Sequence, residues 1–162
     1  RWKRVTGVQT CALPIWLDAL GARLREQGIR LSYHNHAFEL EKFEGDPRCK
    51  LDILYEETAP QNLYAELDLA WVYAGGANPA EYLRKYAGRC PVIHCKDLTR
   101  LEGQKSPHFM PLGRGVLDWD ATLPAARKAG VEWFVYEQDS CDIDVFECCR
   151  ISYEFLKRRV PG

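Results

Sequence analysis

Residues 91–97 read PVIHCKD, an apolar strand that ends in ionisable residues. A helix is predicted just before this stretch, because Asn78 is a good N-cap and Pro79 fits the first helical turn. A second helical pattern follows it, from the capping residue Asp118 to a stop signal at Gly130. Strands that alternate with helices imply a parallel sheet with helical crossovers.

The same alternation extends in both directions along the chain. Strands are expected over residues 29–33, 63–68, 91–95 and 131–137. Helices are expected over residues 16–24, 46–59, 79–87, 118–128 and 142–159. Residues 98–117 are expected to form a long loop after the third strand, which is where α/β enzymes place substrate contacts.

Composition narrows the class of protein. The chain has 162 residues, 46% hydrophobic and 28% charged, which is typical of a soluble globular domain. Lys and Arg number 22 and Asp and Glu 23, so the balanced charge gives no electrostatic reason to expect nucleic acid as a partner. No apolar run approaches the ~20 residues that span a bilayer, and no membrane partner is expected. Seven cysteines without a CxxC spacing favour reduced thiols in a cytoplasmic protein.

The N-terminal segment has a different character. Residues 5–15, VTGVQTCALPI, follow neither a helical nor a strand period, and they resemble one translated frame of a common DNA-sequencing adapter. We therefore expect residues 1–15 to be a non-native segment and residues 16–162 to be the domain. Reading the source DNA around the codon for Trp16 tests this expectation, and an uninterrupted native gene would contradict it.

Ionisable side chains lie at the C-terminal ends of all four predicted strands. They are His34 and His36, Asp68, His94 and Lys96, and Glu137. In a parallel α/β sheet these ends lie on one face, and a (β/α) barrel gathers them around its axis. Imidazole and carboxylate groups that converge there are suitable ligands for a divalent metal.

Each residue also has an ordinary structural explanation. Asp68 could cap the turn that follows it, Lys96 could pair with its neighbour Asp97, and Trp71 could be a packing residue. Glu137 fits such an explanation less well, because it follows an apolar strand and a buried carboxylate costs free energy unless it is paired or metal-bound.

Five motifs occur together in a characteristic order. They are YHNHAFE at 33–39, LDLAW at 67–71, IHCKD at 93–97, LGRG at 112–115 and YEQD at 136–139. This set resembles the sugar phosphate isomerase/epimerase family, the xylose isomerase-like TIM barrels. The resemblance covers residues 16–162 and implies the C-terminal half of a (β/α)8 barrel with about four parallel strands, since a complete TIM barrel typically needs ~250 residues.

The resemblance also implies a metal site, with Mn, Mg, Co or Zn as the divalent cofactor. Family members usually supply Glu, Asp, His and Glu, and Asp68, His94 and Glu137 match the last three in type and order. His34 stands where the first Glu is usual. An imidazole can bind a metal but cannot replace a carboxylate in a two-Glu proton relay, and Glu39 is the alternative for that position.

The implied activity is a divalent-metal-dependent sugar (phosphate) isomerase or epimerase that abstracts an α-proton and passes through an enediolate. Glu137 and His34 are the expected catalytic residues, and the expected substrate contacts are His36, Trp71 and Lys96. One alternative is a keto-sugar or inosose dehydratase or lyase of the same superfamily, which His34 favours. Another is a truncated fragment without catalysis. The expected partner is a small sugar or keto-sugar, and a homo-oligomer is left open.

Overall fold

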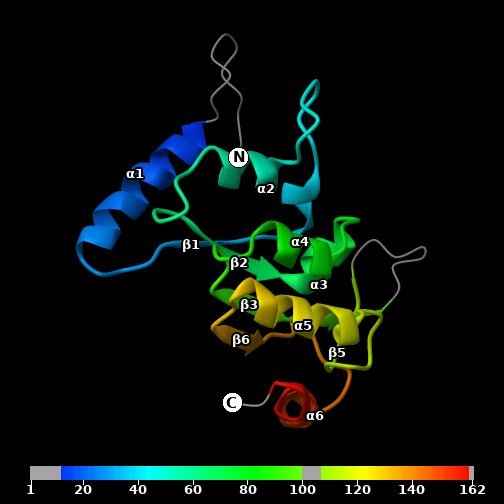
Figure 1. The fold of residues 1–162 in the computed structure, drawn as a ribbon. Coiled ribbons are helices and arrows are strands. Elements are labelled where there is room, and N and C mark those ends of the chain that lie inside the picture. The colour runs from blue at the N-terminus through cyan, green and yellow to red at the C-terminus, as the bar shows by residue number, and fades with distance from the viewer. Residues whose placement is uncertain (1–11, 100–106, 161–162) are drawn as a thin grey trace.

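A computed structural model describes residues 12–99 and 107–160, and its centre is a sheet of four parallel strands (Figure 1). The strands lie side by side in the order β1 (Ser32–His34), β2 (Tyr64–Asp68), β3 (Val92–Cys95) and β6 (Trp133–Tyr136). Every neighbouring pair is parallel, so the chain must cross back between strands. The α/β class and the four parallel strands predicted from the sequence are confirmed.

Helices lie before, between and after the strands, and those between two strands of the sheet provide the crossovers. The helices are α1 (Ala12–Glu26), the 3-10 helix η1 (Ala37–Leu40), α2 (Lys50–Glu56), α3 (Leu69–Ala74), α4 (Pro79–Lys85), α5 (Trp119–Ala129) and α6 (Val145–Arg159). The predicted caps are confirmed: the Asn78 side chain accepts hydrogen bonds at the start of α4, and Asp118 does so at the start of α5. Gly130 ends α5 with a φ of 84°, a left-handed conformation that a glycine adopts without steric cost.

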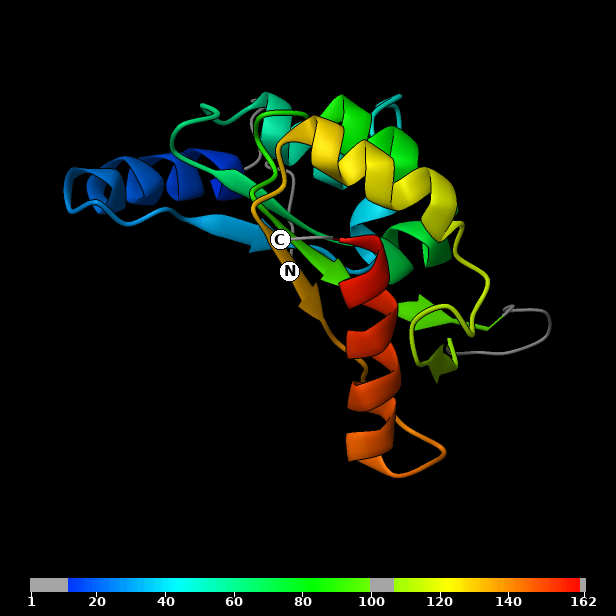
Figure 2. The ribbon, with the colours of Figure 1, turned by 60° about the horizontal axis from the view of Figure 1, so that its bottom comes forward.

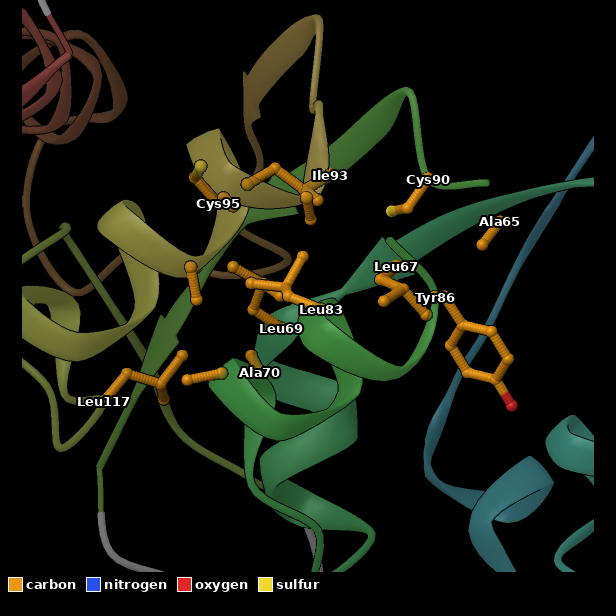
Figure 3. Close-up of a cluster of buried hydrophobic side chains, with 14 of the residues drawn as sticks. Ala65, Leu67, Leu69, Ala70, Leu83, Tyr86, Cys90, Ile93, Cys95 and Leu117 are labelled. Atoms are coloured by element: carbon orange, nitrogen blue, oxygen red, sulfur yellow. The ribbon is translucent and has the colours of Figure 1, made fainter. Parts of the chain in front are cut away.

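The two faces of the sheet differ. Leu67 of β2 and Ile93 of β3 are fully buried and join Leu83 of α4 in an apolar cluster (Figure 3). Helices α4 and α5 lie over this face of the sheet (Figure 2). Side chains alternate along a strand, so the residues between these buried ones point to the opposite face. There Trp133 and Val135 of β6 are 62% and 41% exposed, and the polar strand-end residues lie on the same face.

The structure differs from the expected pattern of elements in several places. The helix expected over residues 46–59 begins at Lys50, because Cys49 is its N-cap and pairs with Lys42 in an isolated antiparallel bridge. The loop expected over residues 98–117 contains an antiparallel pair, β4 (Asp97–Leu98) with β5 (Phe109–Met110). The helix α3 was not expected, and it begins directly after the strand that precedes it.

Residues 12–15 belong to the segment expected to be non-native, and they form the first turn of α1. Pro14 fits there because the N–H groups of a first turn have no partner within the helix. The non-native origin of residues 1–15 stays a prediction. Residues 1–11 lie outside the described residues, and so does Cys11. The described cysteines are all free thiols, and none of the described helices is long and apolar enough to cross a membrane.

Candidate metal centre

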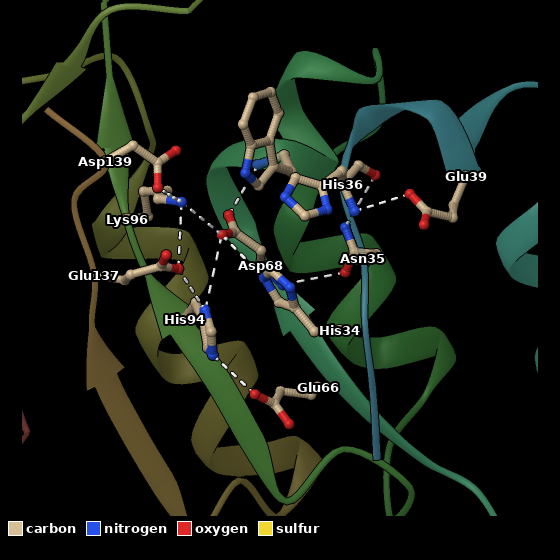
Figure 4. A network of polar contacts seen from close by, with 11 residues as sticks. His34, Asn35, His36, Glu39, Glu66, Asp68, His94, Lys96, Glu137 and Asp139 are labelled. Atoms are coloured by element: carbon tan, nitrogen blue, oxygen red, sulfur yellow. Dashed lines mark hydrogen bonds and ion pairs between the residues drawn. The ribbon is translucent and has the colours of Figure 1, made fainter.

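Four side chains from four different strands converge at one end of the sheet (Figure 4). His34 and Asp68 are the last residues of β1 and β2, His94 lies in β3, and Glu137 directly follows β6. Each offers one ligand atom, and all four atoms lie within 4.8 Å of one another. Parallel pairing explains this, because the register sets Asp68 beside His94 on the adjacent strand.

The closest contacts centre on His94. Its Nδ1 lies 2.6 Å from Oε2 of Glu137 and 3.9 Å from Oδ2 of Asp68. Nε2 of His34 lies 3.4 Å from the same Asp68 oxygen, and the two imidazole rings stack with centroids 4.4 Å apart. A fifth group, the Glu66 carboxylate, was not predicted from the sequence. Its Oε1 lies 2.9 Å from Nε2 of His94, on the far side of the ring.

Asp68 has the capping role considered for it, and it also lies in the cluster of candidate ligands. It is fully buried, and its Oδ1 accepts a hydrogen bond from the backbone N–H of Trp71 at 3.0 Å, which caps α3. The Asp68 backbone N–H donates to Oδ1 of Asn35 at 3.1 Å. These two bonds fix the carboxylate, so that Oδ2 is the oxygen presented to His34 and His94.

Lys96 contacts the same carboxylates and does not form the pair with Asp97 that was considered. Its Nζ lies 3.2 Å from Asp68 Oδ2, 3.2 Å from Glu137 Oε2 and 2.9 Å from Asp139 Oδ1. The Lys96 side chain is only 1% exposed. Burial lowers the pKa of Lys96, but the charges of Asp68, Asp139 and Glu137 outweigh it, so the net pKa is raised and the ammonium stays charged.

Three aromatic side chains, His36, Trp71 and Phe109, lie beside the cluster and form an aromatic wall. The Trp71 ring lies 5.2 Å from the His36 ring and 5.4 Å from Phe109, centroid to centroid. Lys96 Nζ lies 5.6 Å from the Trp71 centroid and 4.9 Å from that of Phe109. The structure therefore brings together the three expected substrate contacts, His36, Trp71 and Lys96. Sequence reasoning missed Phe109, because it lies in the region that was expected to be a loop.

Glu39 does not take the place of the first ligand. It is 1% exposed, its Oε1 accepts a hydrogen bond from the Tyr33 hydroxyl at 2.8 Å, and its Oε2 accepts one from the His36 backbone N–H at 2.8 Å. Both oxygens are therefore used in holding the turn after β1. His34 is the residue of this segment that reaches the cluster.

The local charges suit a cation. Burial raises the pKa of Glu137, but the hydrogen bond with His94 and the charge of Lys96 lower it by more, so this carboxylate is ionised at neutral pH. The hydrogen bond to Asp68 raises the pKa of His34. Three carboxylates, those of Asp68, Glu137 and Asp139, face the ammonium of Lys96. Two imidazoles with two carboxylates form a donor set that can bind a divalent metal. The residues present therefore fit a metal ion.

The sequence matches one known family. The model of the xylose isomerase-like TIM barrel family matches residues 17–147. The chain belongs to this family.

Individual relatives are more distant. The chain is similar to an inosose dehydratase from Geobacillus thermodenitrificans (strain NG80-2), with 27% identity over 87% of this chain and 51% of the relative. A solved sugar phosphate isomerase/epimerase from Parabacteroides distasonis has a TM-score of 0.74 at 21% identity, over 90% of this chain and 52% of its own. A probable 3-DHS dehydratase from Bacillus anthracis has a TM-score of 0.64 at 13% identity, over 92% and 56%. The chain spans about half the length of the relatives that it matches.

Proposed function

We propose that this chain carries the metal centre of a divalent-metal-dependent enzyme that removes a proton next to the carbonyl of a sugar or keto-sugar. The observation that carries the proposal is the convergence of His34, Asp68, His94 and Glu137 within 4.8 Å. Three of these are the residues that the family resemblance implies as ligands, and His34 completes the set.

The chemistry divides between the metal and the side chains. A bound divalent cation supplies Lewis-acid stabilisation of the negative charge that develops on the substrate oxygens. Glu137 is ionised and 37% exposed, so its carboxylate can accept the α-proton. Lys96, held by Asp68 and Asp139, adds a fixed positive charge beside the same oxygens. His36 and Trp71 belong to the aromatic wall against which a sugar ring can stack.

The fate of the proton separates the two candidate reactions. If the proton returns to the substrate carbon, the enzyme is an isomerase or epimerase. That reaction is helped by a second carboxylate on the other side of the substrate, and in this chain the first ligand position holds His34, while Glu39 is occupied elsewhere.

Dehydration is the second candidate, and specific observations favour it. In dehydration the proton that Glu137 accepts can pass to the departing β-hydroxyl, which leaves as water while a C=C bond forms. This reaction needs no second carboxylate to return a proton to carbon. The sequence relatives that match this chain also carry the name inosose dehydratase, at 23–27% identity. A keto-inositol, which has a carbonyl beside hydroxyl-bearing carbons, is the substrate class that fits both the name and the chemistry.

Metal titration tests the site. We expect the 162-residue chain to bind Mn²⁺ or Co²⁺ in isothermal titration calorimetry, and Asp68→Ala and Glu137→Ala to lose roughly 100-fold or more in affinity, since each removes a ligand. Glu132→Gln is the matched control, because Glu132 pairs with Arg30 at the far end of β6. If both alanine variants bind metal as tightly as the unmutated chain, the assignment is wrong.

Product analysis separates the reactions. A protein extended to the length of the relatives is incubated with keto-sugars and an inosose, with metal added. Mass spectrometry then shows either a product of unchanged mass or the loss of one water. Turnover by the extended protein but not by the 162-residue chain would identify the chain as a non-catalytic fragment.

A further inference from the structure

Glu66 lies on the same face of β2 as Asp68, two residues earlier. The pairing register sets it beside His34 on β1 and Val92 on β3. From there its Oε1 lies 2.9 Å from Nε2 of His94, on the side of the imidazole ring that faces away from Glu137 (Figure 4). The Glu66 side chain is 25% exposed, so little water competes for this contact.

The two nitrogens of His94 therefore face two different groups. Nδ1 faces Glu137 and Asp68, and Nε2 faces Glu66. A neutral imidazole carries a proton on one nitrogen and a lone pair on the other, and only the nitrogen with the lone pair can bind a metal. When Glu66 accepts the proton of Nε2, Nδ1 is the nitrogen that can turn a lone pair to a metal in the cluster.

A third residue holds the acceptor in place. The Ser32 hydroxyl of β1 donates a hydrogen bond to the other carboxylate oxygen of Glu66. The series of side-chain contacts from Ser32 through Glu66 to His94 connects three adjacent strands of the described sheet. Carboxylates that hydrogen-bond the far nitrogen of a metal-binding histidine fix its tautomer and its orientation.

We propose that Glu66 is a positioning residue: it accepts the Nε2 proton of His94 and so leaves Nδ1 as the nitrogen that can bind a metal, in place of its hydrogen bond with Glu137. The effect of Glu66 on metal affinity rests on the proposed function. The contact between Glu66 and His94 is present in the structure without a metal.

The first experiment detects which nitrogen of His94 carries a proton. In the metal-free, ¹⁵N-histidine-labelled chain at pH 8, long-range ¹H–¹⁵N NMR is expected to find a proton on Nε2 of His94. In Glu66→Leu the acceptor is absent, and the proton is expected on Nδ1, where it can donate to Glu137. A proton that stays on Nε2 in Glu66→Leu would overturn the proposal.

The second experiment measures the affinity for Co²⁺ by calorimetry. Glu66→Leu is expected to weaken binding by about 10- to 100-fold. Glu66→Gln can present its amide oxygen to His94 and its amide N–H to Ser32 Oγ, so we expect it to retain the Nε2 proton and most of the affinity. If Glu66→Gln loses as much as Glu66→Leu, the negative charge rather than the acceptor is what matters, and the positioning role is wrong.

Two further variants are controls for a loss of folding. Ser32→Ala leaves the Glu66–His94 contact in place and is expected to lower the affinity in the same direction by less. Glu132→Leu makes the same charge change beside the same sheet, away from His94, and is expected to leave both readouts unchanged. Equal binding in the unmutated chain, Ser32→Ala and Glu66→Leu would overturn the inference. If the unmutated chain binds no metal, the proposed function fails, whereas the NMR measurement still decides the role of Glu66.

Discussion

Asp97 is a buried carboxylate that organises the polypeptide beside the metal centre. It is fully buried and follows directly after Lys96. Its two oxygens accept hydrogen bonds from four backbone N–H groups and one indole N–H, those of Leu98, Gly113, Gly115, Leu117 and Trp119. A Cβ atom at Gly115 would lie 2.0 Å from Asp97 Oδ1, so only glycine lets the backbone approach this closely. The LGRG motif therefore serves the loop and not the metal.

Removing this carboxylate should destabilise the chain strongly. We expect Asp97→Ala to lower the free energy of unfolding by roughly 3 kcal/mol, because several buried donors lose their acceptor together. Urea unfolding followed by circular dichroism measures the change. Asp118→Ala is the comparison, since it removes only the N-cap of α5 and should cost about 1 kcal/mol. An Asp97→Ala loss no larger than that of Asp118→Ala would show that the loop does not depend on Asp97.

At the scale of elements, Asp52 links α2 to the end of α4. Its Oδ1 lies 2.7 Å from Lys85 Nζ and accepts a hydrogen bond of 2.5 Å from the Tyr86 hydroxyl. Burial raises the pKa of Asp52, but Lys85 and Tyr86 lower it by more, so the net pKa lies below its usual value. The ionised carboxylate therefore stabilises the folded state more than the unfolded one.

This link gives the stability a defined pH dependence. The contribution of Asp52 is fully present above pH ~4, the pKa of an unfolded aspartate, and is lost as the pH falls through the lower pKa of the folded state. We expect Asp52→Asn to cost about 1 kcal/mol at pH 7, a modest value because Lys85 is 42% exposed to solvent. Unfolding measured from pH 7 to pH 2 should show the two proteins converging. A constant difference across this range would contradict the assignment.

The elements that the sequence predicted well are those with strong local signals. Asn78 and Asp118 have capping side chains, and Gly130 adopts a left-handed conformation. The structure confirms the helices α4 and α5, which these residues begin or end. The four candidate ligands were also found from sequence, because each strand ends in an ionisable residue and parallel strands place these ends together.

Features that depend on contacts distant in sequence could not be predicted. Glu66 precedes Asp68 within an ordinary strand, and its role is visible only through His94, 28 residues later. The contact between Lys96 and Asp139 was missed for the same reason, since the two residues are 43 positions apart. The neighbour Asp97 instead accepts hydrogen bonds from the loop. The β4–β5 pair lacks the length and periodicity that identify a strand.

On the scale of the whole molecule, the face of the sheet that bears the candidate metal centre is exposed at β6. Trp133 and Val135 lie on it beside Glu137, and Trp133 is 62% exposed. The outer strands of the sheet, β1 and β6, each have one neighbour among the described strands. Exposed apolar side chains and unpaired strand edges both promote association with another chain.

We therefore expect the 162-residue chain to self-associate through this face, which sedimentation velocity across a range of protein concentrations would detect. Trp133→Lys should raise the dissociation constant roughly 10-fold or more, because it places a charge in an apolar contact surface. Phe146→Lys is the matched control: Phe146 is 83% exposed but lies on α6. If the two lysine variants weaken association equally, the contact depends on general hydrophobicity and not on the sheet. A chain that remains monomeric at every concentration would show that this face is stable in water.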